Sequence, residues 1–209
     1  MTPDLAFQLG VARDAVIAHV RRLTVDRRPP FLVAIDGGSG SGKSTLGSLV
    51  AEALGAALIR SDDFYASEIP DVEWDRLSPE ARVAQVIDWR RLRREVLEPL
   101  RAGRPAEWHP FDFARVRADG TYPLKRDATR CEPAAVIVLE GAYSSRPELA
   151  DLVNFSVLVD SPVDVRHRRL AAREDGRFLR CWHARWDEAE AYYFSRVRPK
   201  ASFDLIVAN

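Results

Sequence analysis

The feature that most constrains this chain is a glycine-rich loop that stands between an apolar run and a helix-forming run. Residues 37–45 read Gly-Gly-Ser-Gly-Ser-Gly-Lys-Ser-Thr, directly after the apolar segment 31–36. This is the pattern G-x-x-x-x-G-K-[ST], whose glycines let the backbone curl so that successive N–H groups face one point. At the start of a helix such a loop binds phosphate. Because Lys43 occupies the place of the third glycine of a dinucleotide fingerprint, hydride-transfer chemistry is set aside.

The residues of this loop predict a nucleoside triphosphate as ligand. Lys43 supplies a compact positive charge for the β and γ phosphates, and the Ser44 hydroxyl is the expected protein ligand of Mg²⁺. ATP and Mg²⁺ are therefore the expected cofactors. The predicted ATP-binding residues are Gly37, Gly38, Ser39, Gly40, Ser41, Gly42, Lys43, Ser44 and Thr45.

Outside the loop, short β-branched runs alternate with helical stretches, which favours a parallel sheet covered by helices on both faces. The expected strands are 31–36, 57–60, 135–140, 155–160 and 204–208, and the expected helices are 4–23, 43–55, 88–102 and 162–175. The predicted fold class is α/β, as a three-layer α/β/α sandwich with a five-stranded parallel sheet and a short arginine-bearing lid. Residues 1–209 are expected to form one domain, with an N-terminal helix in 1–30, an inserted acceptor-binding segment in 64–133 and the lid in 166–185.

Carboxylates follow two of the expected strands. Asp62 and Asp63 come after the second strand, and Glu140 ends the third. In an open parallel sheet, ligands bind beyond the carboxyl ends of the strands, which places one or both aspartates beside the loop. A hydroxyl acceptor needs a carboxylate to take its proton, and Asp62 is the candidate base, although the pattern leaves Asp63 open for this role. Glu140 is expected to bind Mg²⁺ through water or to orient Lys43.

Arginines are spaced at three or four residues after the fourth strand. Arg166, Arg169, Arg173 and Arg177 would lie along one helical stripe. Such a stripe could neutralise charge on a transferring phosphoryl group, with Arg169 and Arg173 as the predicted catalytic arginines, or form a solvated basic face. Four further arginines lie away from any strand end and are predicted to form a solvated face: Arg90, Arg91, Arg93 and Arg94.

Taken together, the motifs resemble the uridine kinase and phosphoribulokinase branch of P-loop kinases, and uridine-cytidine kinases most closely. The similarity runs from about residue 31 to the C-terminus and rests on segments 37–44, 62–65, 111–113, 138–141, 168–173 and 197–199. It implies a P-loop NTPase fold, Asp62 as base, and Arg169 and Arg173 in a lid that meets the phosphates. The residues expected to bind the acceptor are Asp63, Tyr65, Asp88, His109 and Phe111.

The sequence departs from the family pattern where the acceptor is recognised. Phe111 stands where the family has a tyrosine, no histidine follows Phe113, and the only glutamines are Gln8 and Gln85, so that the glutamine on the lid side is missing. A base edge that is normally recognised by polar groups would lose these partners, and unpaired polar groups discriminate strongly between substrates. The resemblance therefore does not imply that uridine itself is the acceptor.

The composition argues against a nucleic acid polymer or a membrane as the partner of this chain. Lys and Arg number 31, as do Asp and Glu, which gives a formal net charge of zero and no basic excess for a nucleic acid polymer. No apolar run approaches the roughly 20 residues that cross a bilayer, so a cytoplasmic protein without a membrane partner is expected. Cys131 and Cys181 lie far apart and indicate neither a disulfide framework nor a zinc site. The sequence leaves a homo-oligomer possible and does not determine the oligomeric state.

The function predicted from these observations is an ATP-dependent small-molecule kinase that transfers the γ phosphoryl group to a hydroxyl, with a uridine- or cytidine-like nucleoside as the favoured acceptor. One alternative is a kinase of another small alcohol, such as pantothenate, a sugar or a sugar phosphate. The other is a regulatory P-loop protein that binds a nucleotide without catalysis. Against a guanine-binding switch, the chain has no N-K-x-D motif, because Asn154 and Asn209 are its only asparagines.

Overall fold

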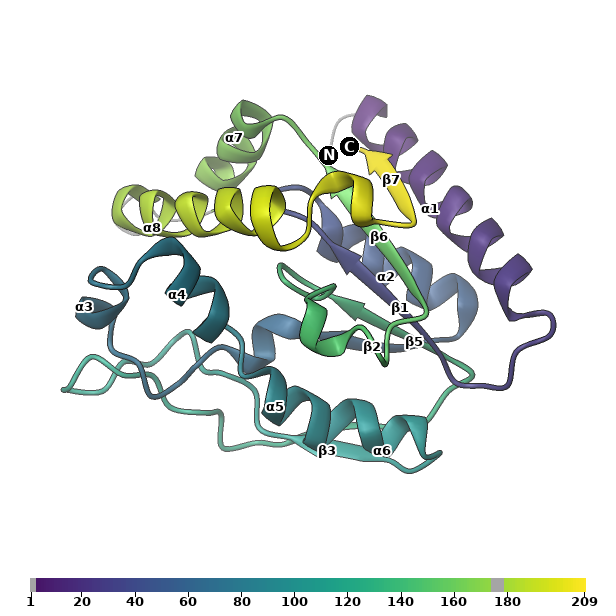
Figure 1. The fold of residues 1–209 in the computed structure, drawn as a ribbon, viewed down its shortest axis with the longest axis horizontal. Coiled ribbons are helices and arrows are strands. Elements are labelled where there is room, and N and C mark those ends of the chain that lie inside the picture. Colours follow the sequence, from purple (N-terminus) through teal and green to yellow (C-terminus); the bar gives the residue numbers. More distant parts are fainter. Residues whose placement is uncertain (1–2, 174–178) are drawn as a thin grey trace.

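A computed structural model describes residues 3–173 and 179–209 (Figure 1). Its centre is a five-stranded sheet in the order β2-β5-β1-β6-β7, in which every pair is parallel. The strands are β1 (Phe31–Asp36), β2 (Ala57–Arg60), β5 (Val136–Glu140), β6 (Phe155–Asp160) and β7 (Leu205–Ala208). The predicted α/β class and the five-stranded parallel sheet are confirmed.

The register of the sheet brings the carboxyl ends of three strands together. Ile35, near the end of β1, pairs with Glu140 at the end of β5, and Arg60 at the end of β2 pairs with the same Glu140. All six residues of β1 are buried, because the strand lies in the middle of the sheet and both of its faces are covered. The glycine-rich loop and the acidic strand ends are therefore placed at one edge of the sheet.

Two helices cover one face of the sheet: α1 (Pro3–Thr24) and α2 (Lys43–Leu54). The buried Val16 and Val20 of α1 and Leu46 of α2 pack with Val33 and Ile35 of β1 in one apolar cluster. Figure 1 shows α1 along the edge of the molecule beside β7. The helix predicted at 4–23 is therefore present and has a packing role. Among the described residues, no helix is both long and apolar enough to cross a membrane.

The opposite face is covered by a helix that the sequence predicted at 88–102 and by α8 (Leu179–Tyr192), which ends in the π-helical turn η4 (Tyr193–Val197). The first of these is interrupted: α5 (Trp89–Leu92) and α6 (Glu98–Arg101) are joined by the π-helical turn η2 (Arg93–Leu97). The N–H of Glu98 donates to the carbonyl of Arg93, five residues back. Pro99 has no N–H with which to continue an ordinary α-helical ladder at this point, which favours the wider turn.

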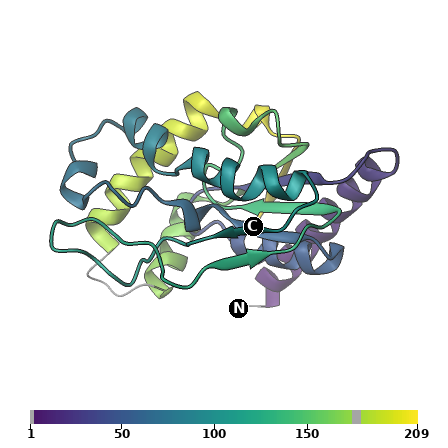
Figure 2. The same cartoon turned by 90° about the horizontal axis from the view of Figure 1, so that it is seen from below.

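The insert between β2 and β5 is built from short elements (Figure 2). Besides the interrupted helix 89–101 described above, they are η1 (Ser61–Phe64), α3 (Asp71–Trp74), α4 (Pro79–Gln85), β3 (Ala106–Trp108) and β4 (Thr129–Cys131). The strands β3 and β4 form an antiparallel ribbon that the sequence analysis did not predict, since each has only three residues. The remaining helices are η3 (Pro147–Leu149), α7 (Val163–Arg173) and η5 (Lys200–Ser202).

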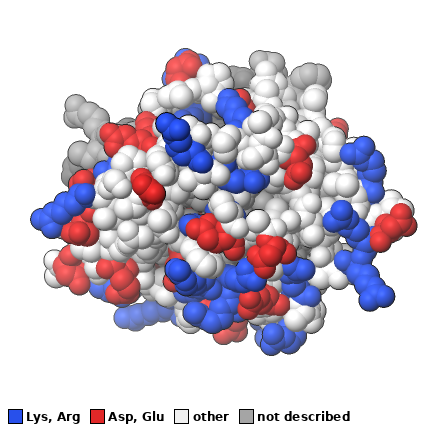
Figure 3. All heavy atoms as spheres, viewed as in Figure 1, with Lys and Arg blue, Asp and Glu red and all other residues white. Residues whose placement is uncertain are grey.

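Charged side chains of opposite sign are interspersed on the face of the molecule shown in Figure 3. Arg93 illustrates the pattern, because its guanidinium binds both carboxylate oxygens of Asp151 at 2.8 and 2.6 Å and also donates to Glu98 at 2.8 Å. This pairing raises the pKa of Arg93 above its ordinary value. The bidentate contact attaches the helix 89–101 to the segment that follows η3.

Candidate active site

The glycine-rich loop leads from β1 directly into α2. Gly40 and Gly42 have φ of 78° and 93°, in the left-handed region that favours glycine, and Gly42 caps the N-terminus of α2. A Cβ at Gly40 would lie 2.6 Å from the carbonyl oxygen of Arg166, so a side chain there would also clash with α7. The loop therefore needs its glycines both for its curvature and for its close contact with neighbouring backbone.

Lys43 is the first residue of α2, and its side chain folds back over the loop. It is buried, and its Nζ donates a hydrogen bond of 3.4 Å to the carbonyl of Gly38. The ammonium group thus lies against the first half of the loop and within the expected path of the β and γ phosphates.

Ser44 and Glu140 form the second contact of the site. The Ser44 hydroxyl donates to Glu140 Oε2 at 3.0 Å, and Arg60 Nε lies 3.5 Å from the other oxygen of this carboxylate. Burial and the nearby charge of Asp62 raise the pKa of Glu140, whereas Lys43, Ser44 and Arg60 act in the opposite direction. Hard oxygen donors beside a phosphate-binding loop suit Mg²⁺, which takes one or two carboxylates and completes its shell with water and phosphate.

The two consecutive aspartates have different surroundings. Asp63 Oδ2 accepts a hydrogen bond of 2.9 Å from the indole N–H of Trp108, and the Asp63 carbonyl accepts from Phe111 N–H at 2.8 Å. Asp62 lies at the end of β5 instead, where its Oδ1 would be 3.4 Å from a Cβ added to Gly141. The charge of Asp62 contributes to raising the pKa of both Glu140 and Tyr65. Of the pair, Asp62 is the one whose side chain approaches the residue after Glu140 and whose charge acts on that carboxylate.

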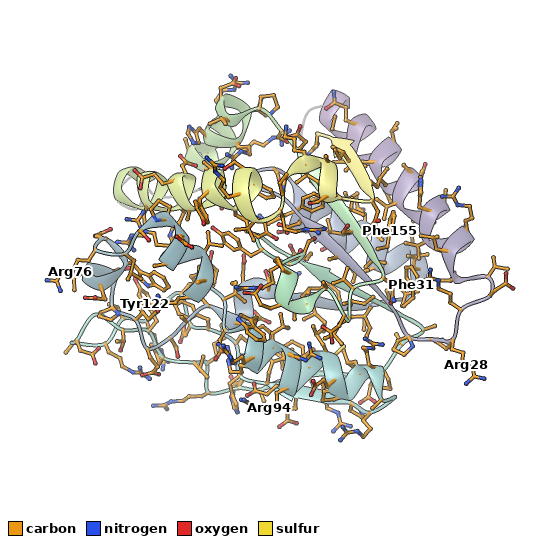
Figure 4. The ribbon with its side chains drawn as sticks, viewed as in Figure 1. Arg28, Phe31, Arg76, Arg94, Tyr122 and Phe155 are labelled. Atoms are coloured by element: carbon orange, nitrogen blue, oxygen red, sulfur yellow. The ribbon has the colours of Figure 1, made fainter. Side chains whose placement is uncertain are left out.

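Aromatic rings gather next to Asp62. The ring of Tyr65 lies 5.7 Å from Phe111, 5.4 Å from Phe113 and 6.1 Å from Trp186, measured between centroids. We refer to these four residues as the aromatic cluster. Phe113 is 49% exposed, which opens the cluster to solvent on one side. Tyr122, labelled in Figure 4, extends it, with a ring 5.1 Å from Phe111 and a hydroxyl that donates to Asp71.

The structure thus brings together Tyr65 and Phe111 from the predicted acceptor-binding set. Phe113 and Trp186 were not predicted as site residues, although Phe113 belongs to a segment that carries the family resemblance. Burial is the main cause that raises the pKa of Tyr65 well above its ordinary value, and the charges of Asp62 and Glu190 add to it. The Tyr65 hydroxyl is accordingly neutral at physiological pH and available as a hydrogen-bond donor.

Asp88 and His109, also predicted to bind the acceptor, lie at the exposed side of the insert. Asp88 caps α5, where its Oδ1 accepts from the N–H of Arg91 at 3.0 Å. His109 Nδ1 lies 3.0 Å from the carbonyl of Lys125. Both residues are engaged in local structure, and their contact with an acceptor stays a prediction.

Arg91 corrects one expectation of the sequence analysis. Its side chain is only 11% exposed, and its guanidinium donates to the carbonyls of His109 at 3.0 Å and Asp63 at 2.9 Å. Burial lowers the pKa of this group. The prediction that Arg91 belongs to a solvated face is wrong, because the guanidinium is turned toward the insert, where it binds the carbonyls of Asp63 and His109.

The arginines of α7 contact the outer side of the loop. Arg169 Nη1 lies 3.3 Å from the carbonyls of both Gly40 and Ser41, and burial lowers the pKa of Arg169. Arg166 donates to the carbonyl of Ser39 at 2.9 Å. The side chain of Arg173 and the whole of Arg177 lie outside the described residues.

Asp36, at the end of β1, is a structural carboxylate that the sequence analysis did not assign. It is completely buried and accepts four hydrogen bonds, from the N–H groups of Gly37, Tyr143 and Ser145 at 2.8, 3.0 and 3.0 Å and from the Tyr193 hydroxyl at 2.9 Å. Burial raises the pKa of Asp36, while these donors and Lys43 act to lower it. Tyr143 has φ of 67°, a left-handed conformation that bends the segment after β5 toward this carboxylate.

Comparison with known proteins agrees with this geometry. The profile of the Phosphoribulokinase / Uridine kinase family matches residues 32–177. The uridine kinase of Deinococcus deserti is 31% identical over 150 residues, which cover 69% of this chain and 69% of that protein. A structure described as a possible uridine kinase from Bacillus stearothermophilus has a TM-score of 0.66 at 18% identity and covers 97% of this chain and 98% of its own. D-glycerate 3-kinase from Cryptococcus neoformans var. grubii has a TM-score of 0.67 at 13% identity, with 96% and 95% covered.

The parallel sheet, the glycine-rich loop and the strand-end carboxylates define a P-loop kinase. The family profile covers more than half of the chain, and the chain belongs to the phosphoribulokinase/uridine kinase family. The resemblance noted from the motifs is thereby confirmed. Because the two solved structures are only 18% and 13% identical to this chain, their similarity supports the fold alone.

Proposed function

We propose that this protein is an ATP- and Mg²⁺-dependent kinase that transfers the γ phosphoryl group to a hydroxyl of a small molecule. The observation that carries the proposal is the convergence of three groups at one edge of the sheet. Lys43 lies over the loop, the Ser44 hydroxyl bonds to Glu140 at 3.0 Å, and Asp62 lies close enough to Glu140 to influence its pKa.

In this proposal each group has one task. The loop N–H groups and Lys43 bind the phosphates and neutralise charge that develops during transfer. Ser44 and Glu140 would hold Mg²⁺, which when bound would supply further neutralisation of phosphate charge. Asp62 accepts the proton of the acceptor hydroxyl while the oxygen of that hydroxyl attacks the γ phosphorus. The bond from that phosphorus to the bridging oxygen breaks, and ADP and the phosphorylated acceptor leave.

The favoured acceptor is a nucleoside of the uridine or cytidine type. The aromatic cluster supports this choice, because its rings lie beside Asp62 and one of them, Phe113, is half exposed and free to contact a planar base. The relative from Deinococcus deserti is itself described as a uridine kinase. We also propose, as in the sequence analysis, that Arg169 and Arg173 act on the phosphates and that Asp63, Asp88 and His109 contact the acceptor.

One observation favours a second acceptor class. Phe111 replaces a phenol with a plain ring in the centre of the cluster, at 5.7 Å from Tyr65, so a polar partner for a base edge is lost. A kinase of another small alcohol, such as pantothenate, a sugar or a sugar phosphate, would not need that partner.

The experiment is an acceptor panel assayed by ADP release with MgATP, in which uridine and cytidine are compared with pantothenate, sugars and sugar phosphates. Lys43→Ala serves as the inactive reference, since loss of its charge removes a phosphate contact. Phosphorylation of a nucleoside with the highest kcat/KM would support the proposal. Tight MgATP binding without transfer to any acceptor would contradict it and favour a regulatory nucleotide-binding protein.

A further inference from the structure

The third residue after β1 in the loop, Ser39, is held by two side chains from separate helices. Glu190 of α8 accepts hydrogen bonds from the Ser39 N–H at 2.7 Å and from its hydroxyl at 2.6 Å, both at Oε1. Arg166 of α7 donates to the Ser39 carbonyl at 2.9 Å. Every hydrogen-bonding group of Ser39 is therefore bound to this pair.

Arg166 and Glu190 also bind each other. The distance from Arg166 Nη1 to Glu190 Oε2 is 2.7 Å, and the two side chains are 12% and 3% exposed. The pair fits against the loop only because residue 38 is glycine, since a Cβ there would lie 2.8 Å from Glu190 Oε2. Both charges are largely removed from water, so neutralising one partner leaves an uncompensated charge next to the loop.

The position of this pair is the terminal-phosphate end of the loop. Lys43 Nζ, the group expected to contact the β and γ phosphates, donates to the carbonyl of Gly38, the residue directly before Ser39. The charge of Glu190 also contributes to the raised pKa of Tyr65 in the aromatic cluster. The Glu190 carboxylate thus lies directly against the loop at Ser39, where it would repel a γ phosphate if it were not paired with Arg166.

We propose that Arg166 and Glu190 form a charge-neutral clasp that fixes Ser39 at the γ-phosphate end of the loop, and that the balance of their two charges sets the preference of the site for ATP over ADP. Both are positioning residues in this proposal. The inference rests on the proposed function, because it requires that the loop binds ATP.

Four single variants and one double variant separate the effect of charge from the effect of side-chain shape. Glu190→Gln keeps an oxygen that accepts from Ser39 but leaves the positive charge of Arg166, so the ratio of ATP affinity to ADP affinity should rise. Arg166→Met leaves the negative charge of Glu190, so the same ratio should fall. We expect each change to be on the order of tenfold, because a γ phosphate a few ångströms away adds charge that ADP lacks. The double variant should return within about threefold of the parent ratio.

Arg166→Lys and Glu190→Asp keep the charges but alter the reach of the side chains. In these variants the affinity ratio should stay at the parent value, while kcat falls because Ser39 is no longer held in place. These two also keep the proposal testable if Arg166→Met does not fold, since they leave no unpaired charge. Circular dichroism spectra establish that each variant is folded before it is titrated.

A second ion pair provides the matched control. Arg168 and Asp164, both on α7, lie 2.8 Å apart and are 71% and 67% exposed. Arg168→Met and Asp164→Asn each remove one charge, positive and negative respectively, from an exposed pair on α7 that does not bind Ser39, so neither should change the ATP-to-ADP ratio, since exposed pairs contribute little.

The measurement is isothermal titration calorimetry with MgATP and with MgADP. Opposite shifts of the ratio in Glu190→Gln and Arg166→Met, with none in the controls, would support the clasp. Equal losses of ATP and ADP affinity in both variants would overturn it and leave the pair a purely structural role. If the parent itself binds no MgATP, the proposed function fails, and that result is distinct from an unchanged ratio in a parent that binds both nucleotides.

Discussion

The indole N–H of Trp108 donates a hydrogen bond of 2.9 Å to the carboxylate of Asp63, and this contact separates the tasks of two neighbouring aspartates. Trp108 is buried in the β3–β4 ribbon, so its N–H depends on Asp63 for a partner. Asp62 is directed to the end of β5 and influences Glu140. The two adjacent acids after β2 therefore differ in their contacts: Asp63 attaches the insert through Trp108, and the charge of Asp62 acts on Glu140.

Asp62→Asn should lower kcat by at least about 100-fold while the affinity for MgATP stays nearly unchanged. The amide keeps the shape of the side chain but cannot take the proton of the acceptor hydroxyl. Single-turnover assays on the best acceptor, together with calorimetric titration of MgATP, measure the two effects separately. A variant nearly as fast as the parent would show that Asp62 is not the base.

Asp63→Ala should reduce the free energy of unfolding by about 1–3 kcal/mol, because the buried indole N–H of Trp108 loses its acceptor. Asp63→Asn retains a carbonyl oxygen for this N–H and is the matched control, with a loss of less than about 1 kcal/mol. Urea denaturation followed by tryptophan fluorescence provides the comparison. Equal stability of the two variants would mean that the Trp108 contact contributes nothing, and a change in acceptor KM would reveal the predicted binding role.

Tyr193→Phe should destabilise the protein by about 1.5–3 kcal/mol, since it removes a hydrogen bond to the buried Asp36 carboxylate. Tyr143→Phe is the control on the neighbouring ring, 4.9 Å away. In the described part of the chain the buried Tyr143 hydroxyl has no hydrogen-bond partner, so its removal should change stability by less than about 0.5 kcal/mol. Chemical denaturation that ranks the two variants in the reverse order would refute this account of Asp36.

The effect of the Arg60 charge on the pKa of Glu140 should be visible in the pH dependence of activity. Burial raises the pKa of Glu140, so its carboxylate is protonated at a higher pH than an ordinary glutamate, and activity that needs the charged form is lost earlier as the pH falls. Arg60 counteracts this shift from 3.5 Å. Arg60→Gln should therefore move the acidic limb of the kcat/KM profile to higher pH, with at most about fivefold lower kcat/KM on that limb.

This effect should shrink at high salt, because the Arg60 side chain is 58% exposed and its field is screened. Arg76→Gln, which removes an exposed charge from the ion pair with Glu73, should leave the profile unchanged. An acidic limb that moves to lower pH in Arg60→Gln would contradict the direction assigned to Glu140.

Local patterns were sufficient to predict the sheet and the loop. The expected strands 31–36, 57–60 and 155–160 coincide with β1, β2 and β6, because buried parallel strands form continuous apolar runs that end at turn residues. The glycines and Lys43 form a contiguous motif, so the local backbone conformation alone determines how they lie relative to one another. The three-residue strands β3 and β4 are too short to show a period of two, so the ribbon was missed.

Features that depend on distant partners were not predictable in the same way. Glu190 is one of many charged residues in a helical stretch, and its partner Ser39 lies 151 positions away in the sequence. Arg91 belongs to a run of arginines typical of a solvated face, and only the approach of the Asp63 and His109 carbonyls gives it a buried role. Side-chain pairing across the fold, rather than periodicity, decides such positions.

The tip of the insert is attached to the chain at both of its ends, close to the turn η1 that follows β2. Phe111 N–H donates to the carbonyl of Asp63 at 2.8 Å, and Lys125 N–H donates to the carbonyl of Pro110 at 2.7 Å, so the tip between them is anchored at both of its roots. The segment 113–122 lies between these two contacts and is joined to the rest of the insert by the Tyr122 N–H, which donates to the carbonyl of Ser67 at 3.2 Å. Under the proposed function, changes of sequence within this segment would alter the acceptor while Lys43, Ser44 and Glu140 keep their positions on the sheet.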